Sequence, residues 1–224
     1  MRFLAALLIF ATLFDPAAAQ PPAGVPVRTL EAIRRDCPLD HQALAAGLVG
    51  KSPQEARRLA YAGIDRFLRS RNASILAAPG SALVAIEARQ AALLRSLGEL
   101  DAGLCARVGD RGLFSSEALA GPVPTGLDEY GEALVQAAKA GAGAGPAAVL
   151  MNKEDFDAWL AAVGKIEPGV PVWAMLQDRA LRARSTPDQL CRGAAAMHEA
   201  VAALPSDRRE RVARTLLRSV LAAP

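Results

Sequence analysis

The sequence predicts an all-α fold, an irregular bundle of seven to nine helices that follows a cleaved signal peptide. Three observations lead to this prediction. Apolar residues recur at three- and four-residue steps, residues that favour helix N-termini stand where these stretches begin, and no segment alternates apolar and polar residues as a half-buried strand does. With 49 alanines and only 10 aromatic residues among 224, the core is expected to consist mainly of leucine, valine and alanine.

The first residues predict export from the cytoplasm. One cation, Arg2, precedes an apolar run from Phe3 to Phe14, and Ala17-Ala18-Ala19 offers small residues for cleavage before Gln20. This run is shorter than the ~20 residues that a membrane-spanning helix needs. We therefore expect residues 1–19 to be removed and the remaining chain to be a soluble periplasmic protein.

The N-terminal part, residues 29–140, is expected to follow a disordered lead-in at residues 20–28, which holds three prolines. Thr29 is predicted to begin one short helix, and Pro38 a second. Ser52-Pro53-Gln54-Glu55 combines an N-cap serine, a proline at the first helical position and a glutamate at the third, which predicts a longer helix to about residue 71. Residues 72–80 are expected to form a turn.

Ser81 is predicted to begin the longest helix, in which leucines and Ile86 form an apolar seam as far as Leu104, with Gln90 as its polar member. A further helix is predicted over residues 127–140. The glycine- and alanine-rich run at residues 141–146 then predicts a hinge before a C-terminal helical part, residues 147–224.

In the C-terminal part, Asn152 is predicted to cap one helix, and residues 172–183 are predicted to form another. Thr186-Pro187-Asp188-Gln189 repeats the N-terminal capping pattern before a third helix. Ser206 begins the last predicted helix, which runs to about Leu221.

Three cysteines follow the predicted signal peptide, and an oxidising compartment favours one disulfide and one remaining thiol. Cys37, Cys105 and Cys191 allow three pairings. We favour Cys37 with Cys105, because Cys37 lies in a weakly structured N-terminal arm where a covalent link would help most, and closing this loop would stabilise the fold by ~4 kcal/mol. The remaining cysteine is expected to be a buried small hydrophobic residue rather than a reactive thiol.

The sequence offers little support for catalysis, metal binding or a cofactor, and we expect none. It contains no CxxC, HExxH, GxSxG or phosphate-loop pattern. His41 is expected to be a partly exposed helix residue. His198 is expected to be an ordinary histidine beside a core methionine, Met197, although these two residues and Cys191 share a helical face and leave a soft-metal site as an alternative. An enzyme remains the third hypothesis, and loss of activity on mutating either histidine would favour it.

Two groups of residues are candidates for binding. The last helix carries Arg208, Arg211, Arg214 and Arg218, a basic face that suits a partner protein or peripheral contact with an anionic membrane. Nucleic acid is not expected, because the chain is predicted to be exported and no aromatic residues interleave the arginines. The second group is a possible apolar pocket near the hinge, formed by Phe156, Trp159, Trp173 and Met175.

The leading functional hypothesis is a non-enzymatic periplasmic protein that binds another component of the cell envelope, expected to be a protein. The alternative is a helical protein that binds an apolar small molecule. Both hypotheses depend on predicted export, the helical pattern and the lack of catalytic motifs.

Overall fold

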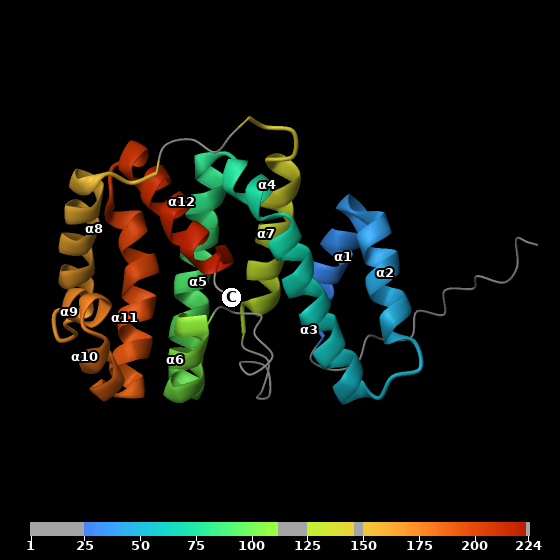
Figure 1. Cartoon of the computed structure of the whole chain (residues 1–224), viewed down its shortest axis with the longest axis horizontal. Coiled ribbons are helices and arrows are strands. Elements are labelled where there is room, and N and C mark those ends of the chain that lie inside the picture. The colour runs from blue at the N-terminus through green and yellow to red at the C-terminus, as the bar shows by residue number, and fades with distance from the viewer. Residues whose placement is uncertain (1–24, 112–124, 146–149, 223–224) are drawn as a thin grey trace, which may run out of the picture.

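Figure 1 shows the computed structural model of the chain, which describes residues 25–111, 125–145 and 150–222. These ranges contain only helices, connected by turns and short extended segments, so the predicted all-α class is confirmed. The predicted signal peptide, residues 1–19, and residues 20–24 of the predicted lead-in lie outside the described residues. Within the described ranges, no helix combines the length and the apolar character needed to cross a membrane.

Nine of the α-helices have seven or more residues, and three short helices and one 3-10 helix, η1, connect them. In chain order the elements are α1 (Val27–Asp36), α2 (Pro38–Leu48), α3 (Pro53–Ser70), α4 (Asn72–Ala77), α5 (Gly80–Leu100), α6 (Ala102–Arg111), α7 (Leu127–Ala140), α8 (Lys153–Ile166), α9 (Val172–Gln177), α10 (Arg179–Arg184), α11 (Pro187–Glu199), η1 (Ala200–Ala203) and α12 (Ser206–Ala222).

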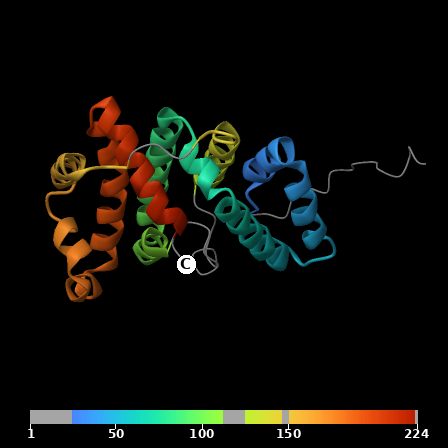
Figure 2. The same cartoon turned by 45° about the horizontal axis from the view of Figure 1, so that its top comes forward.

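Helix α5 lies at the centre of the bundle and packs against α6, α7, α11 and α12. Figures 1 and 2 show α8, α9 and α10 at one end of the molecule, outside α11, and α1 and α2 at the opposite end. Buried side chains from both sides of residues 141–146, such as Leu94 on α5 and Leu217 on α12, belong to one continuous apolar core. The hinge at this segment stays a prediction.

Several helices begin where the sequence predicts, because local side chains satisfy their first amide groups. The Ser52 hydroxyl accepts a hydrogen bond from the Glu55 backbone N–H at the start of α3. Asn152 and Thr186 complete reciprocal capping boxes at the starts of α8 and α11. Helix α7 has the predicted bounds.

Two predicted helices are interrupted, each at an aspartate. Asp101 ends α5, and its carboxylate accepts the Leu104 N–H, so the long helix expected from Ser81 is divided into α5 and α6. Asp178 likewise caps α10 by accepting two backbone N–H groups, so the helix expected over residues 172–183 is divided into α9 and α10. Residues 72–77, expected to be part of a turn, form α4.

Helix α1 begins at Val27, two residues before the predicted start, because its cap comes from another part of the chain. The carboxylate of Asp128, at the start of α7, accepts the backbone N–H groups of Arg28 and Thr29 at 2.8 and 2.7 Å. Thr29 is buried and also donates its hydroxyl to this carboxylate. The close approach needs Gly131 on α7, where a Cβ would lie 2.3 Å from the Thr29 hydroxyl oxygen.

Candidate functional site

An open pocket of about 310 Å³ lies between α6, α9, α10 and α11, and we call it the arginine pocket. Its walls are mostly apolar and include Met175, Leu176 and Met197. Arg107 of α6 and Arg182 of α10 are its charged residues, and no carboxylate is among the described residues that line it. The pocket therefore joins an apolar interior to positive charge, as sites for amphiphilic molecules do.

Small residues and a disulfide hold α6 and α11 close together at this pocket. Ala106 and Gly109 of α6 and Gly193 and Ala194 of α11 line it, and α6 and α11 pack so closely that a Cβ on Gly109 would lie only 2.8 Å from the Ala194 Cβ. One turn away, Cys105 of α6 is bonded to Cys191 of α11, with 5.2 Å between their Cα atoms. The pocket is thus formed by helices that are covalently connected.

The pairing of Cys105 with Cys191 shows that the expected Cys37–Cys105 disulfide is wrong. Cys37 is the free cysteine; it is half-buried between α1 and α2, and burial raises the pKa of its thiol. The N-terminal arm does not need a covalent link, because Asp128 caps α1 and Asp36 forms an ion pair with Lys139 of α7 at 2.6 Å.

The positive charge at the arginine pocket is accessible to solvent. Arg107 and Arg182 are both exposed. Arg107 makes no ion pair with any residue in the described part of the chain. Its guanidinium group is therefore available to an anionic group entering the pocket.

The aromatic residues predicted to form an apolar pocket do come together, but as a packed cluster. The Phe156 ring lies 5.7 Å from the ring of Trp159 and 5.1 Å from that of Trp173, measured between centroids. Trp159 is buried, and its indole N–H donates to the Met197 carbonyl at 2.8 Å. Met175, the fourth predicted residue, lines the arginine pocket instead.

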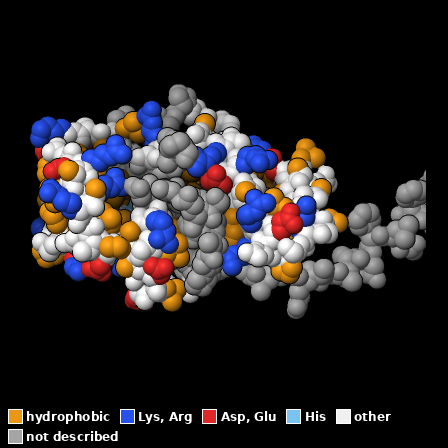
Figure 3. All heavy atoms as spheres, turned by 60° about the horizontal axis from the view of Figure 1, so that its bottom comes forward, with side chains coloured by type: hydrophobic (Ala, Val, Ile, Leu, Met, Phe, Trp, Pro, Cys, Tyr) orange, Lys and Arg blue, Asp and Glu red, His pale blue; other side chains and the backbone are white. Residues whose placement is uncertain are grey.

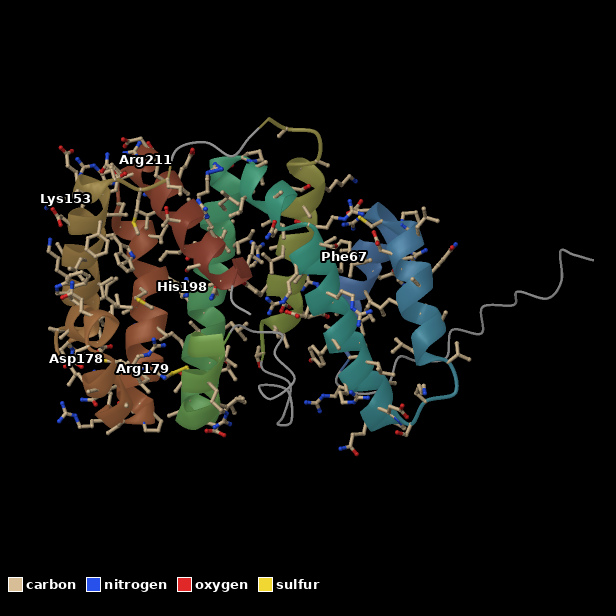
Figure 4. The ribbon with its side chains drawn as sticks, in the orientation of Figure 1. Phe67, Lys153, Asp178, Arg179, His198 and Arg211 are labelled. Atoms are coloured by element: carbon tan, nitrogen blue, oxygen red, sulfur yellow. A yellow bond between two sulfur atoms is a disulfide. The ribbon has the colours of Figure 1, made fainter. Side chains whose placement is uncertain are left out.

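A buried acid and base form a second polar centre, between α5 and α11. His198 Nδ1 lies 2.6 Å from Glu87 Oε2, and both side chains are buried. The other carboxylate oxygen, Glu87 Oε1, has no hydrogen-bond partner among the described residues. Burial raises the pKa of Glu87, and the neighbouring His198 opposes this shift. In Figure 4, His198 lies on the side of α11 that faces α5.

Other polar groups surround this pair. One helical turn from Glu87, Gln90 accepts a hydrogen bond from the buried Tyr130 hydroxyl at 3.1 Å. His198 also lines a second open pocket, of about 320 Å³, together with Arg95 and Glu199. These two residues form an ion pair at 2.8 Å, so the positive charge of the second pocket is neutralised.

His41 is partly exposed on a helix, as expected, and the alternative of a soft-metal site at His198 is wrong. His41 is half-buried on α2, and burial lowers its pKa. His198 is a core residue, and its carboxylate partner was missed. Cys191 is in the disulfide and so offers no thiolate for a metal. The described residues include no cluster of three or more potential metal ligands.

The four arginines predicted to form a basic face on α12 have different surroundings. Arg211 donates two hydrogen bonds to the buried Asp155 carboxylate, at 2.6 and 2.8 Å, near the upper end of α8 in Figure 4. Arg208 lies 3.9 Å from the same carboxylate. Arg214 is buried and donates to the Leu76 carbonyl at 2.6 Å, whereas Arg218 is exposed. A partner or membrane face on α12 stays a prediction, and most of its charge already has a contact within the chain.

Comparisons with protein-family models, with curated proteins and with solved structures found no match. The two sites differ in what they offer a ligand. The arginine pocket combines apolar walls with two exposed arginines, and the Glu87–His198 pair is a buried polar centre beside a pocket whose arginine is paired with a glutamate.

Proposed function

We propose that this chain is an exported, non-enzymatic helical protein that binds another component of the cell envelope, and that this component is an amphiphile with an anionic head group. The arginine pocket carries the proposal. Its apolar walls suit a hydrocarbon chain, and the exposed Arg107, which makes no ion pair with any described residue, suits the head group.

Each part of the pocket has a separate energetic role. Burial of a hydrocarbon chain against Met175, Leu176 and Met197 contributes ~0.8 kcal/mol for each methylene group removed from water. A guanidinium group donates parallel hydrogen bonds to the oxygens of a carboxylate or phosphate. Arg107 therefore selects for the charge of the head group, and the walls select for the length of the chain.

Isothermal titration of the chain from Gln20 onward with hexanoate, octanoate and decanoate tests the proposal. We expect the dissociation constant to fall about fourfold for each added methylene group until the pocket is filled. Decylamine, which has the same chain and the opposite charge, is expected to bind far more weakly.

Two tryptophan substitutions on α10 locate the binding site. Ala183 lines the pocket and is exposed, so A183W fills the pocket without disturbing the core. Ala180 is equally exposed on the same helix and does not line the pocket, so A180W is the matched control. Loss of decanoate binding in A183W alone supports the proposal, whereas equal affinity of the two variants, or equal binding of decylamine and decanoate, rejects it.

A protein partner is the second candidate, and an exposed face of α2 favours it. Leu39 on α2 and Val49 directly after it are each 79% exposed, and the helix has no buried residue. A photo-reactive amino acid at position 39, compared with one at the exposed Arg58 of α3, tests this candidate. A crosslinked product of one defined mass at position 39 only is the supporting result.

Export is tested on the chain expressed with residues 1–19. We expect the chain recovered from a periplasmic extract to begin at Gln20. An intact mass that still includes residues 1–19 would reject cleavage.

A further inference from the structure

Exposed apolar side chains gather on α9, at the edge of the arginine pocket. Trp173 is 41% exposed and Leu176 is 46% exposed, although α9 has only six residues. The Trp173 ring is held in place by its edge contact with Phe156. Tryptophan and leucine at a protein surface are favourable where that surface meets the boundary between water and lipid.

Positive charge surrounds these apolar residues. Arg179, Arg182 and Arg184 of α10 are all exposed, and the one acidic residue in this stretch, Asp178, uses its carboxylate to cap α10. Residues 172–186 thus carry a charge of +2 of the +3 of the whole chain. Figure 3 shows blue cationic, orange hydrophobic and some red acidic side chains interspersed at the end of the molecule that holds α8 to α11.

We infer that the edge formed by α9 and α10 docks on an anionic phospholipid bilayer, with Trp173 and Leu176 entering the interface and Arg179 and Arg184 contacting the lipid phosphates. The inference deepens the proposed function, on which it rests, by naming the bilayer as the source of the amphiphile. Docking in this way brings Leu176 and Arg182, which line the arginine pocket, to the lipid surface.

The other exposed surfaces fit a bilayer less well. The apolar residues of α2 have no lysine or arginine on their own helix, and the nearby Lys51 forms an ion pair with Glu55. On α12, Arg211 and Arg214 are used in contacts within the chain. The α9–α10 edge combines two exposed large apolar residues, Trp173 and Leu176, with the exposed Arg179 and Arg184.

Sedimentation with vesicles tests the docking, using the chain from Gln20 onward and lipids that are three parts phosphatidylcholine to one part phosphatidylglycerol. We expect R179Q/R184Q to bind about thirtyfold more weakly than the unchanged protein, about fivefold for each arginine. The matched control is R58Q/R66Q, which removes the same charge from exposed positions on α3, far from this edge, and is expected to change binding by less than about twofold. Equal loss in the two pairs, or equal binding to pure phosphatidylcholine, overturns the inference.

Fluorescence reports whether the apolar residues enter the bilayer. Of the two tryptophans, Trp159 is buried and Trp173 is exposed, so bromine atoms on the lipid chains are expected to quench the unchanged protein but not W173F. Quenching that persists in W173F contradicts the inferred orientation.

The docking and the pocket can fail separately. Arg179 and Arg184 do not line the pocket, so R179Q/R184Q is expected to bind decanoate like the unchanged protein, and A183W is expected to lose decanoate but keep vesicle binding. Vesicle binding without any decanoate binding rejects the proposed function alone. Decanoate binding with no preference for anionic vesicles rejects the docking alone.

Discussion

Removal of the Cys105–Cys191 disulfide is expected to cost much of the stability of the fold. The two cysteines are 86 residues apart, so the bond restricts a long loop of the unfolded chain. The chain-entropy relation gives about 15 cal/mol/K for a loop of this length, which is about 4.6 kcal/mol at 25 °C. Since single domains are typically stable by about 5–15 kcal/mol, this is a large share of the free energy of unfolding.

Urea unfolding followed by circular dichroism measures the effect in C105A/C191A, with C37A as the control that removes the free cysteine. We expect the free energy of unfolding to fall by about 4.6 kcal/mol in the double variant. It should fall much less in C37A, because Cys37 forms no disulfide and closes no loop. We also expect decanoate to bind C105A/C191A more weakly, because α6 is no longer tied to α11 behind the arginine pocket. A loss below about 1 kcal/mol in the double variant, or alkylation of Cys105 or Cys191 without reductant, would refute the reasoning.

Three further predictions concern polar contacts between helices. In urea unfolding at pH 7, H198A is expected to lower the free energy of unfolding by about 3–5 kcal/mol, because the buried Glu87 carboxylate loses its partner. E87Q/H198A is expected to be more stable than H198A, because it no longer buries an unpaired carboxylate. D155N is expected to lose about 2 kcal/mol at pH 7. Arg211 lowers the pKa of Asp155, so the stabilisation by this ion pair is fully present above the ordinary aspartate pKa of about 4. The difference in the free energy of unfolding between D155N and the unchanged protein should disappear as the pH falls through the lowered pKa. A constant difference down to about pH 2 would contradict this. D128A is expected to lose about 1–2 kcal/mol, with faster hydrogen exchange of the first amides of α1 and unchanged exchange in α3.

The features that could be predicted from the sequence depend on residues close together in the chain. The helix starts at Ser52, Asn152 and Thr186 each use a side chain three residues from the amide that it caps. The division between α5 and α6 follows the same rule, because Asp101 accepts the N–H of Leu104, three residues later. This aspartate could have indicated a new helix start, but the leucine pattern continues across it and suggested one unbroken helix.

The features that were missed depend on distant residues. Asp128 caps α1 from about a hundred residues away, and Arg211 contacts an aspartate 56 residues earlier in the chain. No spacing rule identifies such partners before the helices are placed. For the Glu87–His198 pair a partial signal existed. Glu87 and Gln90 lie three residues apart on the apolar side of a predicted helix, where buried polar side chains require hydrogen-bond partners.

The cap that Asp128 provides to α1 also affects the order in which the chain folds. Synthesis begins at the N-terminus, so residues 27–36 emerge about a hundred residues before the carboxylate that completes their helix. Contacts of such high sequence separation form late, because the loop between them must close first. Helix α1 is therefore expected to be unstable on the nascent chain until α7 has emerged. Its packing against α7 is then a late step in folding.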